Sequence, residues 1–217
     1  MAQLLGPFAN TLSRVVLTSI VVVPLVLIGG LIGAQWSPMT IGQNETRVQP
    51  IPFSHKHHVG EMGIDCRFCH TTVEHTEFAG MPSTHICMTC HSQLFTSVPM
   101  LAPVRESLAE HKRLNWVRVN TLPDYVYFDH SIHIAKGVGC AECHGPVAQM
   151  PLMRQAAPLT MGWCLSCHRD PGPHLRAQDE ITDTSFVAHN SLAEAAAMVR
   201  AYHIDVAHLT DCSVCHR

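Results

Sequence analysis

The chain has 217 residues and a formal net charge of -3 at pH 7, and it contains ten Cys, 17 His and ten Met but only 6% aromatic residues. This length accommodates one domain of ordinary size together with a membrane anchor. The slightly negative charge and the lack of a basic run argue against nucleic-acid binding. The excess of Cys and His points instead to metal or prosthetic-group chemistry.

The N-terminal part of the chain predicts a membrane anchor. Residues 1–14 carry a single charge, Arg14, and are assigned to a cytoplasmic N-terminus. From Val15 to Ala34 there are 20 consecutive uncharged residues, which as a helix would extend about 30 Å, the thickness of the hydrocarbon core. With Trp36 at the interface, residues 15–36 are predicted to form one transmembrane helix. A cleaved signal peptide is the alternative, but its apolar region is usually shorter.

Within this span, Pro24 is predicted to bend the helix. Gly29 with Gly33, and Gly30 with Ala34, form rows of small residues. Such rows allow another membrane helix to approach closely, although short motifs of this kind also arise by chance. They are compatible with packing against a partner subunit.

Residues 37–52 are polar, contain three prolines and are predicted to form an extended linker. In the domain that follows, residues 53–217, all ten Cys fall in C-x-x-C pairs, and each pair is followed at once by His. The motifs are Cys66, Cys69 and His70; Cys87, Cys90 and His91; Cys140, Cys143 and His144; Cys164, Cys167 and His168; and Cys212, Cys215 and His216. C-x-x-C-H is the attachment sequence of c-type haem, in which both thiols bond to the porphyrin and the His ligates the iron. The chain is therefore predicted to bind five haem c groups covalently, with these five His as proximal ligands.

Zinc is the alternative to haem, because C-x-x-C pairs about 15 to 20 residues apart are also typical of zinc sites. Two of the intervals in this chain fit that spacing. The His after every pair favours haem, since zinc chemistry does not need it. The last pair, Cys212 and Cys215, also has no partner pair with which to complete a four-ligand site.

A repeat organises the haem domain. FSHKHHVGEMGIDCRFCH (residues 53–70) recurs as FDHSIHIAKGVGCAECH (residues 128–144) with one residue fewer. The copies share a Phe, two His three residues apart, and a Gly before the first Cys, for which Gly63 is matched with Gly139. A second attachment motif follows each copy.

We therefore predict duplicated two-haem halves at residues 53–91 and 128–168, with the fifth haem at residues 212–216. With 14 Pro and 13 Gly, the chain lacks the long periodic apolar runs of a layered core. The haems are expected to form the core of a mostly α fold with much irregular loop and almost no sheet, which does not fold without haem.

Two further helices are predicted in the haem domain. Pro103 is placed to begin a short helix. A second helix runs from about Leu192 to Tyr202, where Ser191 and Glu194 fit a capping box.

The histidine pairs of the repeat are predicted to supply distal iron ligands: His55 and His58 in the first copy, and His130 and His133 in the second. A spacing of three places each pair on one side of a helical turn, from which it can reach two irons. The other histidines outside the motifs are expected at the surface or against haem propionates: His57, His75, His85, His111, His174, His189, His203 and His208.

Four distal histidines leave one of five irons without a sixth ligand. Methionine sulfur is the other usual ligand of a c-type iron and raises its reduction potential. Met150 or Met161 is favoured for this role over Met153, although most methionines only fill space in a core. The alternative is an open iron.

The paired histidines before C-x-x-C-H resemble those of the tetrahaem and trihaem cytochromes of the c3/c7 type. Three strings, YFDHSIHIAKGVGCAECHGPVAQM, PLTMGWCLSCHRDP and LTDCSVCHR, follow the N-terminal span. In this order they resemble the pentahaem cytochrome c subunit of bacterial alternative complex III.

That resemblance implies an electron-transfer subunit, not an enzyme by itself, in an inner-membrane complex that oxidises menaquinol. The implied partners are quinol-binding integral membrane subunits, an iron–sulfur subunit and a monohaem cytochrome c, with a periplasmic cytochrome c or a small copper protein as acceptor. The haem domain is expected on the periplasmic side, because c-type haems are attached outside the cytoplasm. Two other functions stay open: a multihaem reductase with one open iron, and a stand-alone membrane quinol dehydrogenase.

Overall fold

The structure of the chain, a computed structural model, describes residues 6–185 and 190–216. It divides into two compact units, residues 1–43 and 44–217, which are described separately below. His189, one of the histidines expected at the surface, lies outside the described residues, and so do residues 1–5 of the predicted cytoplasmic N-terminus.

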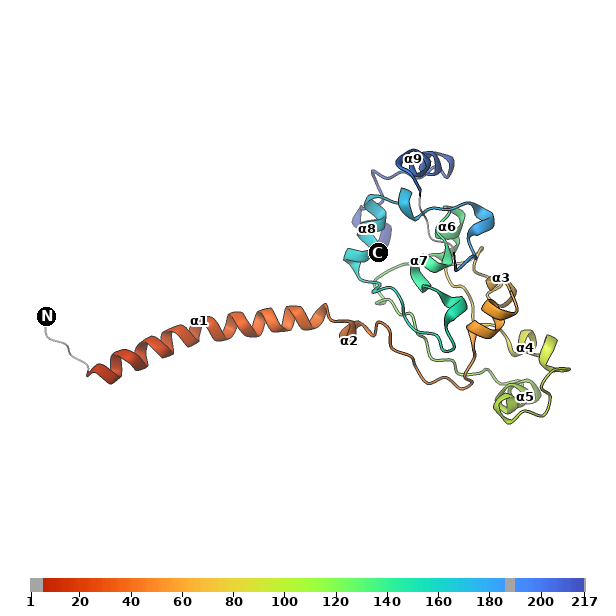
Figure 1. Cartoon of the computed structure of the whole chain (residues 1–217), viewed down its shortest axis with the longest axis horizontal. Coiled ribbons are helices and arrows are strands. Elements are labelled where there is room, and N and C mark those ends of the chain that lie inside the picture. The colour runs from red at the N-terminus through yellow and green to blue at the C-terminus, as the bar shows by residue number, and fades with distance from the viewer. Residues whose placement is uncertain (1–5, 186–189, 217) are drawn as a thin grey trace. The chain divides into compact units, whose positions relative to one another are not determined.

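The first unit consists of α1 (Pro7–Gln35) and α2 (Pro38–Ile41) (Figure 1). α1 begins eight residues before Val15, with Pro7 in its first turn, where the missing N–H is not needed. Its 29 residues extend about 43 Å, more than the hydrocarbon core requires. It continues through Pro24 with a gentle curve (Figure 1). Among the described residues it is the one helix long and apolar enough to cross a membrane.

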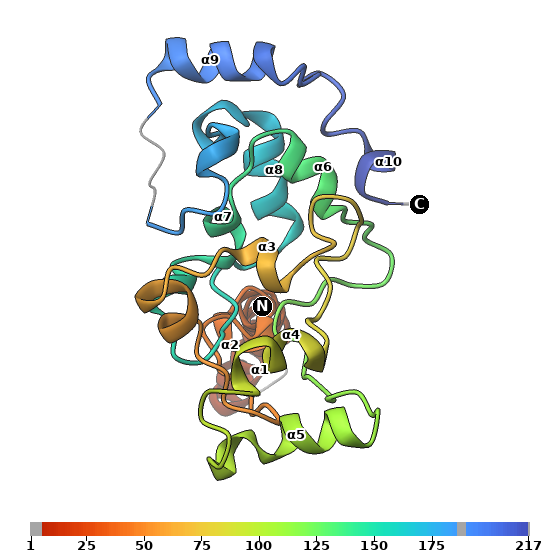
Figure 2. The same cartoon turned by 90° about the vertical axis from the view of Figure 1, so that its right-hand side faces the viewer.

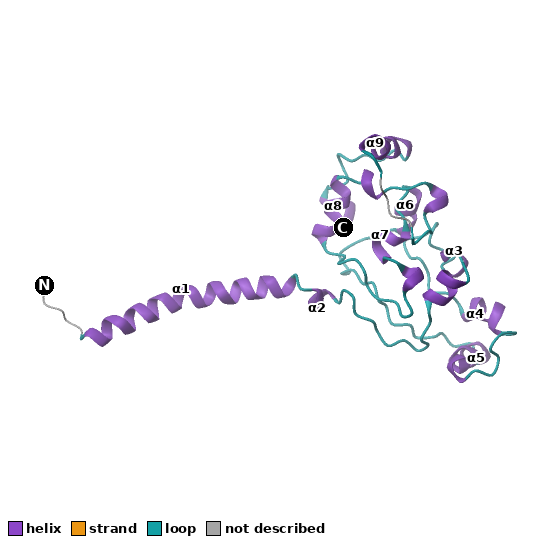
Figure 3. Ribbon diagram, in the orientation of Figure 1, coloured by secondary structure: helices purple, strands orange, loops and turns teal. Residues whose placement is uncertain are grey.

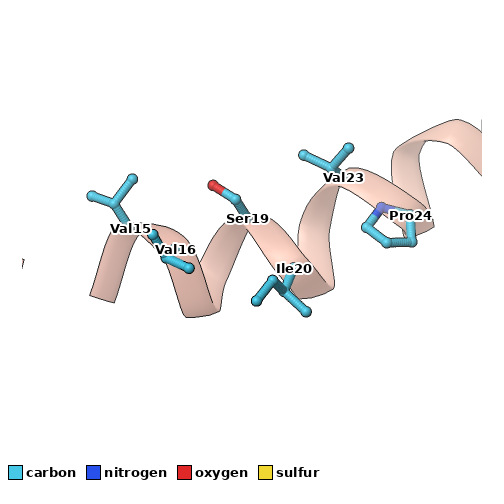
Figure 4. A pocket seen from close by; sticks show the side chains of 6 residues that line it. All are labelled: Val15, Val16, Ser19, Ile20, Val23 and Pro24. Carbon is cyan, nitrogen blue, oxygen red and sulfur yellow. The ribbon is translucent and has the colours of Figure 1, made fainter. Parts of the chain in front are cut away.

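None of the residues of α1 is buried within the chain. A shallow hollow lies along the helix around Pro24, and Figure 4 shows the side chains that line it: Val15, Val16, Ser19, Ile20, Val23 and Pro24. Apolar side chains exposed over the whole length of a helix require lipid or another membrane helix to cover them.

The segment predicted as an extended linker, residues 37–52, is more ordered than expected. Ser37 begins α2, and its side chain accepts a hydrogen bond from the Met39 N–H at 3.3 Å. From Asn44 onward the chain belongs to the second unit, where the Asn44 N–H donates to the Gln155 carbonyl oxygen at 2.8 Å.

The second unit is built from short helices joined by loops, with no β-strand among its described residues (Figure 3). The α-helices are α3 (Cys66–Cys69), α4 (Thr84–His91), α5 (Ala102–Ala109), α6 (His130–Ala135), α7 (Cys140–His144), α8 (Met161–Arg169), α9 (Leu192–Ala201) and α10 (Cys212–Cys215). A π-helix (Lys56–Glu61) and four 3-10 turns (Pro99–Leu101, Val147–Gln149, Gly172–His174, Gln178–Glu180) complete it. The mostly α, loop-rich fold predicted from the sequence is confirmed.

Both helices predicted between and after the motifs are present. Pro103 lies in the first turn of α5. The capping box of α9 is complete, since the Ser191 N–H donates to the Glu194 carboxylate at 2.8 Å and the Glu194 N–H donates to the Ser191 hydroxyl at 3.3 Å.

Ring packing in the two repeat copies is nearly identical. Phe53 stacks on His58 with centroids 4.4 Å apart and planes at 24°, and Phe128 stacks on His133 at 4.4 Å and 27°. Each Phe also meets the first His of its pair edge-on, at 4.9 and 4.8 Å. The repeated residues therefore fix the same local arrangement twice.

The extra residue of the first copy lies between its second His and its first Cys, where the chain forms a π-helix and the second copy forms α6. Hydrogen bonds from i to i+5 make a π-turn one residue longer than an α-turn, which accommodates the insertion. The glycines that correspond are Gly63 and Gly137, each three residues before the first Cys, with φ of 68° and 83°. The predicted match of Gly63 with Gly139 is therefore wrong, because Gly139 has φ of -74° and precedes α7 as its N-cap.

Few apolar side chains of the second unit are buried. Its buried cluster consists of Val73, Ile134 and Ile181, with Ala79 and Cys140 packed against it. These residues come from both halves and from the segment after the fourth motif, so the cluster joins all three. Such a small core contributes little against the conformational entropy of folding a unit of this size. We therefore expect prosthetic groups to supply most of the burial in this unit.

We expect the second unit to lose its fold when haem attachment is prevented. The full chain, produced without haem attachment, should show no cooperative thermal transition by circular dichroism and should be digested rapidly by protease. The haem-loaded chain is the control and should unfold cooperatively. A cooperative transition in the haem-free chain would contradict the dependence on haem.

Candidate haem sites

Each attachment motif lies in a short helix, namely α3, α4, α7, α8 and α10. The helical turn places the two thiols, three residues apart, on one side. It also fixes the His that follows, since the His70 N–H donates to the Cys66 carbonyl oxygen at 2.9 Å and the His216 N–H donates to that of Cys212 at 2.9 Å. The geometry of one motif is thus a local consequence of its sequence.

The first motif is held by Asp65, the N-cap of α3. Its carboxylate accepts hydrogen bonds from the Arg67 backbone N–H at 2.8 Å and from the Arg67 guanidinium at 2.9 Å. The Thr182 hydroxyl donates to it at 2.9 Å and links the motif to a distant segment. The hydrogen bonds from Arg67 lower the pKa of Asp65 to about 2, so this anchor stays charged at neutral pH.

The ring nitrogens of the predicted iron ligands show one common arrangement. In seven of the nine, Nδ1 lies 2.7 to 3.2 Å from a backbone carbonyl oxygen: His58 with Ser54, His70 with Gly80, His91 with Leu94, His130 with Glu77, His133 with Asp129, His168 with Leu209, and His216 with Tyr125. A carbonyl oxygen only accepts hydrogen bonds, so Nδ1 carries the proton. Nε2 then keeps its lone pair, which is the tautomer that ligates a metal through Nε2.

Two predicted ligands differ from this arrangement. His144 Nδ1 lies 3.1 Å from the Asn120 side-chain amide nitrogen, and the buried Asn120 Oδ1 has no partner among the described residues. Turning the Asn120 amide by 180° lets Oδ1 accept from His144 Nδ1–H and gives the same tautomer. His55 Nδ1 is buried without a hydrogen-bond partner in the described part of the chain, and the ring packs edge-on against Phe53.

Burial keeps these imidazoles neutral. It lowers the pKa of His55 to about 4, and the neighbouring His70 and His58 lower it further. It also lowers the pKa of His144 to about 4, with added contributions from His130, His70 and His55. Burial likewise lowers the pKa of His133. At neutral pH these rings are therefore in the unprotonated form that binds iron.

Three distal histidines lie opposite proximal histidines. The ring centroids are 6.2 Å apart for His58 and His91, 6.4 Å for His130 and His144, and 6.1 Å for His133 and His168. Two imidazoles that bind one metal ion from opposite sides, each with a metal–nitrogen distance of about 2.0 Å, have centroids about 6 Å apart. The three pairs thus have the spacing that a shared iron requires.

In the second copy the two histidines lie near two different motifs. The ring of His130 lies near that of His144 in its own copy, and the ring of His133 lies near that of His168 in the next motif. In the first copy the ring of His58 lies near that of His91 in the next motif in the same way. His70 is one of the groups that lower the pKa of His55, after burial.

No described histidine ring is paired with His216 in this manner. Its ring instead lies 5.8 Å from that of Tyr125, and the Tyr127 N–H donates to the Cys215 carbonyl oxygen at 2.8 Å. Of the two predicted methionine ligands, Met150 is fully buried, whereas Met161 begins α8 and is 64% exposed.

Thiols of different motifs influence one another's pKa. The interaction of the Cys140 thiol with that of Cys66 raises the pKa of Cys140, and burial raises it further. Burial raises the pKa of Cys143 to about 12, and the Cys167 thiol adds to this effect. Before haem attachment, Cys140 and Cys143 are therefore neutral at pH 7.

Two further thiols have raised pKa values. Burial raises the pKa of Cys69, and the thiol of Cys87 raises it further. The pKa of Cys164 is raised by burial and then by the Cys215 thiol. Among the described residues no group of three or more His, Cys, Asp or Glu side chains is placed to hold a metal ion directly.

Histidines that were not predicted as ligands have different surroundings. Three of them hold Nδ1 within 3.1 Å of a carboxylate: His57 at Glu61, His174 at Glu142, and His208 at Asp211. His75, His85, His111 and His203 are exposed. In these three histidines the partner of Nδ1 is a carboxylate, whereas in seven of the nine predicted ligands it is a backbone carbonyl oxygen.

Two residues at the third motif were not identified from the sequence. Asn120 positions His144, as described above. The fully buried Arg176 guanidinium donates to Glu142 Oε1 at 2.9 Å and to the Asp183 carbonyl oxygen at 2.9 Å. A Cβ on Gly139 would lie 2.2 Å from this guanidinium, so only glycine fits there. No motif marks an isolated Asn or Arg, and their roles emerge only from tertiary contacts.

Comparison with known proteins gives two matches. Residues 112–213 match the family model described as Cytochrome c552. The menaquinone reductase multiheme cytochrome c subunit of Nitratidesulfovibrio vulgaris (strain Hildenborough) is 39% identical over 121 residues, which are 54% of this chain and 55% of that protein. The chain thus spans about half the length of the curated relative it matches. With the attachment motifs, these matches support a multihaem c-type cytochrome with covalently bound haem c.

We expect His58→Ala to open one iron. Loss of the imidazole opposite His91 should convert one low-spin ferric haem to high spin, visible by electron paramagnetic resonance. The matched control is His57→Ala, because His57 is the adjacent residue but binds Glu61 at the surface. An unchanged low-spin spectrum in His58→Ala, or a high-spin signal in His57→Ala, would contradict this assignment.

Proposed function

We propose that the chain is a membrane-anchored pentahaem cytochrome c that transfers electrons between a membrane quinone-linked complex and a periplasmic acceptor. The observation that carries this proposal is the opposed histidine pairing, with centroid distances of 6.1 to 6.4 Å in three sites. An iron held on both faces by imidazole has no position left for a substrate. Such a site suits electron transfer.

The residues of the chain have distinct tasks in this function. The ten Cys would attach the haems, and Nε2 of the paired histidines would hold the irons. Hydrogen bonds from Nδ1 to carbonyl oxygens fix the ring orientation and increase the basicity of the ligand, which tunes the reduction potential. Haem c itself supplies one-electron oxidation and reduction when bound.

The proposed location in the membrane rests on α1 and on the similarity of the chain to subunits of membrane complexes. α1 would anchor the chain in the inner membrane, with its uncovered apolar side chains packed against lipid or integral membrane partners. The resemblance to the alternative complex III subunit implies quinol-binding subunits, an iron–sulfur subunit and a monohaem cytochrome c as partners. The relative from Nitratidesulfovibrio vulgaris is itself named as a subunit of a menaquinone reductase. Both support a menaquinone-linked complex. The haem unit would face the periplasm, because c-type haems are attached outside the cytoplasm.

The direction of electron flow separates two candidates. The resemblance favours menaquinol oxidation and electron delivery to a periplasmic cytochrome c or copper protein. The name of the relative, a menaquinone reductase subunit, favours the reverse direction, in which the haems deliver electrons toward menaquinone. The same haems can serve either direction, since the potentials of their partners set the net flow. We propose the oxidising direction as the first candidate.

The experiment that tests this function uses the full complex purified from membranes. The pyridine haemochrome spectrum should give five haem c per chain. A menaquinol analogue should reduce these haems rapidly in the complex and should not reduce them in the separated subunit. Haems that are reduced only by a periplasmic donor and oxidised by menaquinone would favour the second candidate. Reduction of the separated subunit by quinol would favour a stand-alone dehydrogenase.

Met161 is our candidate for the distal ligand of the fifth iron. It lies three residues before Cys164 on α8, and His168 of the same helix has its Nδ1 2.9 Å from the carbonyl oxygen of Leu209, three residues before the fifth motif. Met150 is less suited, because it is fully buried and its methyl group lies 3.5 Å from the Cβ position of Gly145, directly after the third motif.

We expect Met161→Leu to change one haem only. Loss of the thioether should lower the potential of the highest-potential haem or convert it to high spin, because Met ligation raises the potential. Met150→Leu is the matched control and should leave all five midpoint potentials in place. The measurement is a redox titration monitored by electron paramagnetic resonance. A spectrum of Met161→Leu identical to that of the unmodified chain would exclude this ligand.

A further inference from the structure

Ring contacts and hydrogen bonds connect the attachment motifs two at a time. The ring of His58, in the first copy, lies 6.2 Å from that of His91 in the second motif, centroid to centroid. The Thr182 hydroxyl donates to Asp65, the residue before Cys66, at 2.9 Å, and the Cys140 N–H donates to the Ile181 carbonyl oxygen at 3.0 Å. The first motif therefore adjoins the second and shares residues 181–182 with the third.

The same kind of contact continues in the second half. His133 lies seven residues before Cys140 of the third motif, and its ring lies 6.1 Å from that of His168 in the fourth motif, centroid to centroid. The third motif therefore has the first and the fourth as neighbours, whereas these contacts give the second motif one neighbour.

The histidine contacts agree with this arrangement. His58 lies eight residues before Cys66, so the contact between its ring and that of His91 keeps the first and second motifs adjacent. His130 is held by the Glu77 carbonyl oxygen at 2.7 Å, a contact between the two halves.

Hydrogen bonds also attach the segment around the fifth motif to the fourth. The His168 ring lies 2.9 Å from the Leu209 carbonyl oxygen, three residues before Cys212. In both Figure 1 and Figure 2, α4, α3, α7 and α8 succeed one another across the second unit, and Figure 2 shows α10 next in the series.

We propose that the five haem sites form one unbranched row in the order second, first, third, fourth and fifth motif. The row does not follow the sequence, because the second motif stands at one end and the first motif is internal. This inference rests on the proposed function, because it assumes that five haems are attached. It adds that the chain exchanges electrons with its partners at the two ends of the row, near α4 and near α10. Within the row, each transfer oxidises one iron and reduces its neighbour.

The matched variants His55→Ala and His58→Ala distinguish this order from the order of the sequence. Each opens one iron, the first or the second, and gives it a high-spin ferric signal. In the oxidised protein, low-spin ferric neighbours broaden that signal through magnetic interaction, and reduction of the neighbours removes the broadening. The full haem-loaded chain is used, and its haem content is measured first.

The first iron has two neighbours in the proposed row and the second iron has one. We expect a broader high-spin signal in His55→Ala than in His58→Ala, with the difference lost on reduction of the remaining haems. Equal widths, or a broader signal in His58→Ala, would overturn the order. If either variant loses haem, an experimental structure of the unmodified haem-loaded chain decides the question. The second-motif iron should then have the first-motif iron as its only close neighbour, and a third-motif neighbour would overturn the order.

The outcomes separate this inference from the proposed function. Fewer than five haems in the unmodified chain would contradict the pentahaem assignment itself. Five haems arranged with the first motif at one end would contradict only the order of the row.

Discussion

The hydrogen bond from imidazole Nδ1 to a backbone carbonyl oxygen is the interaction on which the rest of the structure depends. It selects the tautomer with a free Nε2 at seven of nine predicted ligands. It also sets the direction in which each ring points, and so where an iron between two rings would lie. Because His130 and His168 bond to carbonyl groups of other segments, the same bonds hold distant parts of the chain together.

These bonds matter more here than in an ordinary domain, because the polypeptide buries few apolar side chains of its own. The cluster around Ile134 and Ile181 joins the halves but is too small to define a fold alone. The short helices position the thiols and imidazoles, and the loops only have to connect one helix to the next. This explains why 3-10 turns and isolated bridges suffice where other domains use sheets.

The residues that would attach haem and bind iron can largely be predicted from the sequence. The residues from distant segments that hold them in place cannot. The motifs, the placement of two histidines on one side of a turn and the capping box of α9 all follow from local spacing, whereas the proximity of His58 to His91 and of His133 to His168 comes from the structure. The π-turn of the first copy and the match of Gly63 with Gly137 were missed, since a one-residue difference does not reveal where the backbone absorbs it. Arg176 and Asn120 were missed because their partners are distant in sequence, and the order of the motifs in space was hidden for the same reason.

The choice of main-chain atoms as partners for Nδ1 has a consequence for mutational tolerance. Every residue has a backbone carbonyl group, so Ser54, Leu94 or Leu209 can be replaced without removing the acceptor. Substitutions at these positions should therefore leave the hydrogen bond to Nδ1, and with it the basicity of most iron ligands, unchanged. Asn120 is the exception, because the partner of His144 is a side chain, and the third site is the one most exposed to change by a single substitution.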